Sequence, residues 1–256
     1  MELSTIIGMV VAIVALGVGF VMKGVALHAL VVPAAYLIIF GGTAAAILNA
    51  FPLRDLKAFP KLMGKIFKGQ KLMGEEEVIE LFCHYASIAR RDGLLALEPH
   101  AADMKDPFIK KGLMMIIDGR EPDFVETVLD QDIHLMEERH HGFASIFSQA
   151  GGYAPTLGVL GAVVGLIAAL GNLSDIEKLG HSIAAAFIAT LLGIFVGYVL
   201  CHPFCNKLKR MSHHEAEIKK IVFAGIMSLQ AGDSVSTMED KLSVFLQAHE
   251  RKIKED

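Results

Sequence analysis

Residues 154–170 read APTLGVLGAVVGLIAAL, an apolar stretch with a proline near its start and no charged residue. Gly158, Gly161 and Gly165 lie three and four residues apart, so a helix places them along one side. A helix flank that lacks side chains lets a neighbouring backbone approach closely, as in many membrane helix pairs. Pro155 removes one backbone donor and loosens or kinks the first turn. This stretch therefore predicts a helix that packs tightly, and can bend, inside a membrane.

Three other uncharged stretches have the length of a membrane-spanning helix. The four stretches together are Leu3–Met22, Leu30–Ala50, Gly151–Leu170 and Ser182–Leu200. Each has about 20 residues, which as a helix covers roughly 30 Å of hydrocarbon. The chain is 53% hydrophobic with a mean hydropathy of +0.48, too apolar for an ordinary soluble domain. We expect an all-α membrane protein with four transmembrane helices.

These spans divide the chain into four segments. We expect transmembrane helices at about 3–22 and 30–50 within 1–50, a helical cytoplasmic domain over 51–150, transmembrane helices at about 151–170 and 182–204 within 151–204, and a helical cytoplasmic tail over 205–256. The chain starts Met-Glu-Leu-Ser, without the basic residues that open a secretion signal. We therefore expect the first span to be retained.

Basic residues predict the orientation in the membrane. The connections 23–29 and 171–181 hold one lysine each, whereas six basic residues follow the second span and three follow the fourth. The positive-inside rule places both termini and the large central loop in the cytoplasm. Along Arg54–Lys71 the basic residues alternate with apolar ones, which predicts an amphipathic segment on the anionic inner leaflet. The net charge of −4 sums over several compartments and gives no indication of nucleic-acid binding.

The central region and the tail have helix signals of their own. Acidic residues from Glu75 onward open a helix that Gly93 ends. Asp106 is expected to cap a helix that begins with Pro107, and a longer helix follows from Glu121. In the tail we expect helices over 215–230 and from about Thr237. No strand pattern competes with this helical periodicity.

Enzyme chemistry and metal binding have little support in the sequence. Cys201, His202 and Cys205 lack a fourth ligand nearby, so buried thiols are the better interpretation. The histidine pairs at 140–141 and 213–214 are interpreted as solvated helix faces, since no zinc-protease motif or phosphate-binding lysine accompanies them. We expect no enzymatic activity, no metal and no cofactor.

An ion path through a membrane normally requires an ionisable group on an inward face. None of the four uncharged stretches contains a carboxylate, histidine, lysine or arginine. Their polar residues are weaker groups such as Thr190, which lies in a second helix rich in small residues. Two explanations stay open at this point. The protein is a non-conducting scaffold, or a partner subunit supplies the titrating carboxylate.

Three long motifs resemble those of the MotA family of flagellar stator subunits, most closely the Bacillus-type members. They are RRDGLLALE at Arg90–Glu98, YAPTLGVLGAVVGLIAALG at Tyr153–Gly171 and LGHSIAAAFIATLLGIFVGY at Leu179–Tyr198. HPFCNKLK at His202–Lys209 fits the family as well, so the resemblance covers almost the whole chain. It implies a multi-pass protein of the bacterial cell membrane. It also implies a homopentamer around two MotB helices, with MotB supplying the ion-binding aspartate.

The resemblance also implies roles for individual residues. Residues 151–204 would line the pore, with Thr190, Ala162, Pro155, Gly158, Gly161 and Gly165 along the ion path. Pro155 and Pro203 match the family's functional prolines and would act as hinges. Within 51–150, Arg90 and Glu98 match the charged pair that engages the rotor protein FliG. Asp132 falls where some members carry a glutamate with the same function.

The transported ion is expected to be the proton. Sodium-type stators usually carry a second threonine in the third helix, where this chain has Gly161-Ala162-Val163. Loss of that hydroxyl removes an oxygen that a dehydrating sodium ion would use, whereas a proton moving onto an aspartate does not need it. The alternatives are a sodium-driven stator, an ExbB/TolQ-type channel that energises another process, and the non-conducting scaffold.

Overall fold

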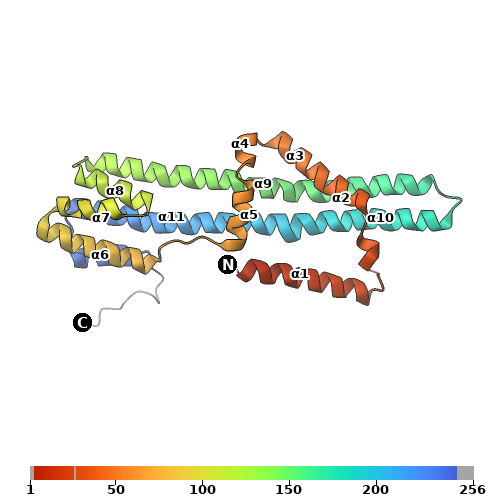
Figure 1. Ribbon diagram of the computed structural model, residues 1–256, viewed down its shortest axis with the longest axis horizontal. Coiled ribbons are helices and arrows are strands. Elements are labelled where there is room, and N and C mark those ends of the chain that lie inside the picture. Colours follow the sequence, from red (N-terminus) through yellow and green to blue (C-terminus); the bar gives the residue numbers. More distant parts are fainter. Residues whose placement is uncertain (1–2, 26, 247–256) are drawn as a thin grey trace. The chain divides into compact units, whose positions relative to one another are not determined.

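The computed structural model describes residues 3–25 and 27–246, and every regular element in that part of the chain is a helix (Figure 1). Within these residues, four helices are long and apolar enough to cross a membrane, which confirms the all-α fold with four spans. The chain forms two compact units, one of residues 1–70 with 140–210 and one of residues 71–139 with 211–256. We call them the membrane unit and the bundle unit. The end of the predicted tail, 247–256, lies outside the described residues.

The first two spans belong to the membrane unit. Helix α1 (Leu3–Met22) buries none of its residues. The second span consists of α2 (Pro33–Tyr36), a π-helical turn (Leu37–Gly41) and α3 (Gly42–Ala50), and α2 packs against α10 (Ile176–Ile194). The apolar side chains of α1 are therefore free to face lipid or other protein.

The basic segment after the second span forms α4 (Leu53–Leu56) and α5 (Phe59–Lys68). Leu62 and Ile66 of α5 are buried against apolar residues of the same unit, among them Phe147 and Leu208. The apolar face predicted for membrane contact is thus partly used by the protein itself.

The third and fourth spans are parts of much longer helices. Helix α9 runs without interruption over Pro122–Leu170, through Gly151, Gly152 and Pro155. Helix α10 continues through a π-helical stretch (Phe195–Cys201) into α11 (His202–Ala231). The boundaries expected at 150/151 and 204/205 therefore lie inside continuous helices. Each glycine costs a helix only about 1 kcal/mol relative to alanine, which packing against neighbouring helices offsets.

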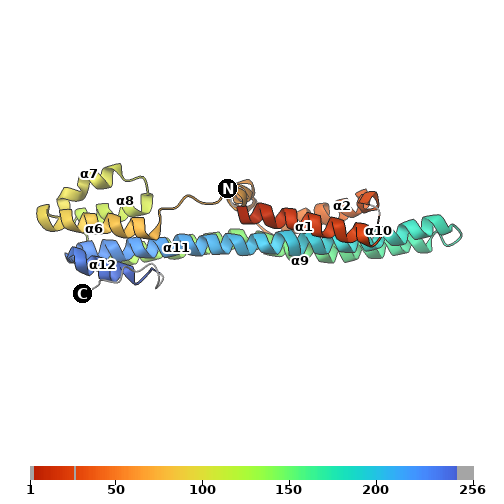
Figure 2. The ribbon, with the colours of Figure 1, turned by 90° about the horizontal axis from the view of Figure 1, so that it is seen from below.

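The bundle unit has a core of large apolar side chains, of the kind found in soluble domains. It contains α6 (Glu75–Asp92), a 3-10 turn (Leu94–Leu97), α7 (Glu98–Asp103), α8 (Pro107–Ile117) and α12 (Val235–Ser243), together with the first part of α9 and the last part of α11 (Figure 2). Asp106 caps α8 as expected, because its carboxylate accepts the Phe108 and Ile109 amides. The core consists of fully buried large side chains such as Phe82, Leu113, Leu129, Ile226 and Met238.

Candidate functional site

Helices α9 and α10 touch backbone to backbone along a line of glycine and alanine residues. A methyl group built on Gly193 would lie 2.6 Å from the Ala154 carbonyl oxygen, and one built on Gly158 would lie 2.8 Å from the Ala189 carbonyl oxygen. Such distances leave no room for any side chain larger than hydrogen. We call this line the small-residue seam. Its members are Ala154, Gly158, Gly161 and Gly165 on α9, and Ala186, Ala189, Gly193 and Gly197 on the facing helix.

The three glycines that the sequence placed on one flank all belong to the seam. A methyl group on Gly161 would lie 3.2 Å from the Cβ of Ala189, and one on Gly165 would lie 3.0 Å from the Cβ of Ala186. The smooth flank of α9 is therefore covered by α10 of the same chain. Large apolar side chains point away from it and are about half exposed, among them Val159, Val163, Val164, Leu166 and Ile167.

Pro155 fits into the notch that two seam glycines leave on the opposite helix. A methyl group on Gly197 would lie 2.7 Å from Cγ of Pro155, and one on Gly193 would lie 3.2 Å from its Cα. Gly197 lies within the π-helical stretch Phe195–Cys201, and Pro203 follows that stretch by two residues. Pro203 has no amide to donate back along the helix, and π-helical turns commonly accompany such a lost hydrogen bond. Pro203 thus lies just after a departure from regular α-helix, whereas Pro155 belongs to the unbroken helix α9 and packs against that stretch.

Thr190 and Ala162 lie on the two helices that the seam joins. The Thr190 hydroxyl donates to the Ala186 carbonyl at a long 3.4 Å, and a methyl group on Gly158 would lie 3.4 Å from the Thr190 Cα. Ala162 follows seam residue Gly161 and is partly exposed. No member of the seam can ionise. The hydroxyl of Thr43, in the second span, is buried and has no hydrogen-bond partner among the described residues.

Arg90 and Glu98 lie on either side of one turn in the bundle unit. Arg90 is in the last turn of α6, Glu98 opens α7, and Gly93 between them has a φ of +84°, which favours glycine. Both side chains are exposed, and neither forms an ion pair within the part of the chain that the structure describes. Next to them, Arg91 donates to Asp92 at 2.8 Å and lowers the pKa of that carboxyl. Arg90 and Glu98 therefore keep their charges available for another molecule.

Asp132 has a different environment on α9. Its carboxylate accepts a hydrogen bond from Nζ of Lys111 at 2.9 Å, and its side chain is 30% exposed. The pair lines a shallow hollow of about 360 Å³ together with Thr127, Leu135 and Arg139. The structure therefore places Arg90 and Glu98 on the two sides of one turn. Asp132, by contrast, already forms an ion pair with Lys111.

A small hollow of about 100 Å³ beside Arg90 was not predicted from the sequence. Leu94, Gln230 and Asp233 help to line it. Gln230 donates from Nε2 to the Arg120 carbonyl at 2.6 Å, which fixes the orientation of its amide and leaves Oε1 buried without a partner among the described residues. Residues of α6 and α11 meet here, and only the fold reveals that proximity.

Comparisons with known proteins place this geometry among membrane channel subunits. The model of the MotA/TolQ/ExbB proton channel family matches residues 100–221, and that of the motility protein A N-terminal region matches residues 6–93. Motility protein A of Bacillus subtilis (strain 168) is 48% identical over 251 residues, covering 98% of this chain and 93% of that protein.

Two solved structures have the same fold. The flagellar MotAB stator complex from Bacillus subtilis matches with a TM-score of 0.92 at 48% identity, covering 97% of this chain and 98% of that one. The structure of C. jejuni MotAB matches with a TM-score of 0.93 at 31% identity over the full length of both chains. Both likenesses extend over the membrane spans and the helices of the bundle unit.

Proposed function

The chain belongs to the MotA/TolQ/ExbB proton channel family as a flagellar stator subunit, and we propose that it conducts protons together with a MotB-type partner. It is a multi-pass membrane protein and not an enzyme. The observation that carries the proposal is the small-residue seam, along which two membrane helices meet and none of whose members can ionise. Because a proton path needs such a group, the carboxylate would come from MotB. Five copies of this chain would surround two copies of MotB, with residues 151–204 lining the pore.

Torque would arise from a change of packing in this ring. Protonation of the MotB aspartate removes its charge, and its release inward restores that charge. Each step would favour one of two arrangements of the aspartate against the ring, so that the ring advances around the MotB pair. Bending would concentrate at Pro203 and in the π-helical stretch that Pro155 faces, since regular α-helix is interrupted in that stretch.

The rotor would be engaged by the turn that carries Arg90 and Glu98. Opposite charges that form no ion pair among residues 3–25 and 27–246 can pair with complementary charges on FliG, and such pairs set register and specificity. Asp132 is the weaker candidate for this contact, because Lys111 already neutralises it. The bundle unit would therefore lie on the cytoplasmic side.

The distribution of basic residues supports a proposed orientation in the membrane. Both termini would be cytoplasmic, since lysines and arginines concentrate after the second and fourth spans. Arg54 of α4 and the lysines of α5 would contact anionic lipid headgroups of the inner leaflet. The membrane would be the inner membrane of a bacterial cell.

The proton is proposed as the ion because Ala162 offers no hydroxyl. We expect swimming speed to be independent of sodium concentration and to collapse when a protonophore is added. Speed that follows sodium and survives the protonophore would instead support a sodium-driven stator. The same measurements on matched cells carrying Ala162→Thr test whether this position contributes to the selection of protons over sodium ions.

The remaining alternatives are an ExbB/TolQ-type channel and a scaffold that conducts nothing. Expression with and without the MotB partner in cells that lack their own stator separates them. The stator restores swimming only with the partner. An ExbB/TolQ-type channel conducts protons without restoring swimming, and a scaffold does neither.

A further inference from the structure

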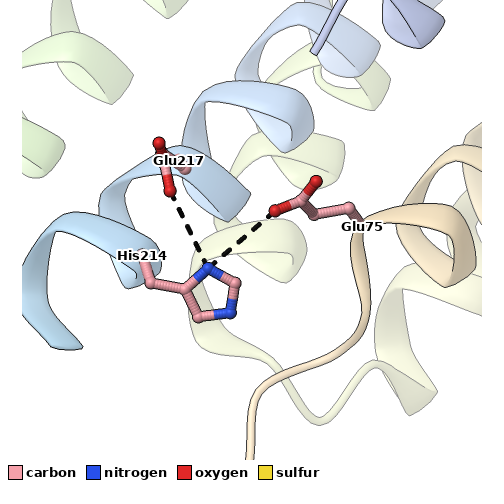
Figure 3. Close-up of side chains that lie close together, drawn as sticks. All are labelled: Glu75, His214 and Glu217. Atoms are coloured by element: carbon pink, nitrogen blue, oxygen red, sulfur yellow. Dashed lines mark ion pairs between the residues drawn. The ribbon is translucent and has the colours of Figure 1, made fainter. Parts of the chain in front are cut away.

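A histidine and two glutamates from distant parts of the sequence meet on the bundle unit (Figure 3). Glu75 is the first residue of α6, whereas His214 and Glu217 lie one turn apart on α11. The Nδ1 atom of His214 lies 3.9 Å from Oε1 of Glu75 and 3.8 Å from Oε2 of Glu217. Both carboxylates therefore point at the same ring nitrogen from two different helices.

One imidazole nitrogen and two carboxylate oxygens are a donor set that suits divalent transition metals. The three ligand atoms lie within 4.8 Å of one another. Metal–ligand bonds of about 2.0–2.2 Å would draw them to separations of roughly 3–3.5 Å. The side chains of His214, Glu217 and Glu75 are 55%, 49% and 26% exposed, so small rotations of partly free side chains can close that difference. Water would complete the coordination.

The charge around the three residues favours a cation. The two carboxylates bring two negative charges, while an imidazole that coordinates a metal is neutral. Glu76 and Glu77 add further negative charge in the same first turn of α6. Glu77 already accepts the Gly74 amide at 3.3 Å as part of the helix cap. The Nε2 atom of His213 lies 3.3 Å from Oε1 of Glu217, the carboxylate oxygen that does not face His214. This contact can hold the carboxylate in its orientation.

We propose that Glu75, His214 and Glu217 bind one divalent transition-metal ion of the zinc class. The nitrogen ligand disfavours magnesium and calcium, which prefer oxygen alone. A bound ion would tie the start of α6 to α11 and so stabilise the bundle unit, because binding to the folded state alone raises stability. The inference does not depend on which ion the membrane channel conducts.

Cobalt is the probe that reports this site directly. The full-length chain is purified in detergent without a polyhistidine tag, titrated with Co²⁺ and followed by visible absorption, then heated with and without Zn²⁺. We expect one Co²⁺ per chain and a rise of several degrees in the unfolding temperature with Zn²⁺. His214→Gln and Glu75→Gln are each expected to weaken binding at least about tenfold, because each removes a ligand. His141→Gln, an exposed histidine of α9 outside the cluster, should leave binding unchanged.

Two outcomes would overturn the proposal. One is the absence of saturable Co²⁺ absorption in the unaltered chain, which would leave the cluster as an ordinary ion-pair contact. The other is equal binding by His214→Gln and the unaltered chain, which would place the metal elsewhere. If His214→Gln fails to fold, Glu75→Gln decides alone, because it keeps the shape of the side chain and removes only a charged ligand.

Discussion

The core of the bundle unit and the small-residue seam of the membrane unit are packed from opposite kinds of side chain. In the bundle unit, Phe82 and Leu113 are completely buried. Along the seam, glycines and alanines bring two helix backbones together, whereas large residues of the spans such as Ile13 (60% exposed) and Ile167 (64% exposed) face outward. Water drives large apolar groups inward, but lipid is as apolar as they are and provides no such force. Helices are therefore held together by large buried side chains in the core of the bundle unit and by close backbone approach along the seam.

The largest loss of stability is expected from emptying the core of the bundle unit. Phe82→Ala should lower its free energy of unfolding by about 3–5 kcal/mol, because a fully buried ring leaves a cavity. Hydrogen exchange of α6 and α12 amides in the detergent-solubilised chain measures it. Phe124→Ala is the control, since Phe124 is 50% exposed and should cost less than about 1 kcal/mol. Equal losses for both variants would mean that this core is not organised around Phe82.

In the membrane unit the most damaging change should be the addition of a single methyl group. Gly193→Ala forces apart backbones that would lie 2.6 Å from the new carbon, at a cost of about 1–3 kcal/mol. We expect swimming to be strongly reduced although the protein still reaches the membrane. Gly17→Ala in α1 is the matched control, because no atom lies within 4 Å of the added carbon. Full motility of the Gly193→Ala strain would show that the seam tolerates separation.

A smaller effect is expected where α11 ends in the bundle unit. Lys241 and Ser228 donate to the Asp233 carboxylate and hold its pKa below the usual range. Asp233→Asn should cost about 1–2 kcal/mol, the contribution of charge-assisted hydrogen bonds.

The pH dependence of this contribution has a defined sign. Because the pKa is lowered in the folded state, Asp233 stabilises the fold above the unfolded-state value, about 3.9, and loses that contribution as the pH falls toward the folded-state value. Acid unfolding of Asp233→Asn should therefore be shallower than that of the unaltered chain. Superimposable acid unfolding curves would contradict the assigned hydrogen bonds.

The smallest effect on stability is expected at the exposed turn of the bundle unit. Arg90→Glu breaks no ion pair within the described chain, so the unfolding temperature should stay unchanged. Torque should fall, because the charge offered to the rotor is reversed. Tethered-cell rotation measures torque, and Arg91→Glu, next to Asp92, is the comparison. Undiminished torque in the Arg90→Glu strain, without a compensating change in the rotor, would remove this turn from the rotor contact.

Much of this fold could be predicted from local sequence. Uncharged stretches gave four spans, and Asp106 with Pro107 marked the start of α8, because both signals depend only on neighbouring residues. The continuity of α9 through Gly151 and Pro155 could not be predicted, since packing overrides the local penalties of these residues.

The sites were less predictable than the spans. Periodicity placed Gly158, Gly161 and Gly165 on one flank, but it could not say that α10 of the same chain would cover that flank. The histidine pair at 213–214 was interpreted as a solvated face, because Glu75 lies far away in sequence and only the fold brings it to His214. Contacts between distant segments leave no local pattern to read.

Proton uptake by cells that carry the chain with its MotB partner tests the central claim most directly. The account predicts uptake only when the membrane aspartate of the partner is intact, none when that residue is replaced by asparagine, and none from this chain alone, because the small-residue seam has no group that titrates. Uptake that persists without the partner carboxylate would contradict it.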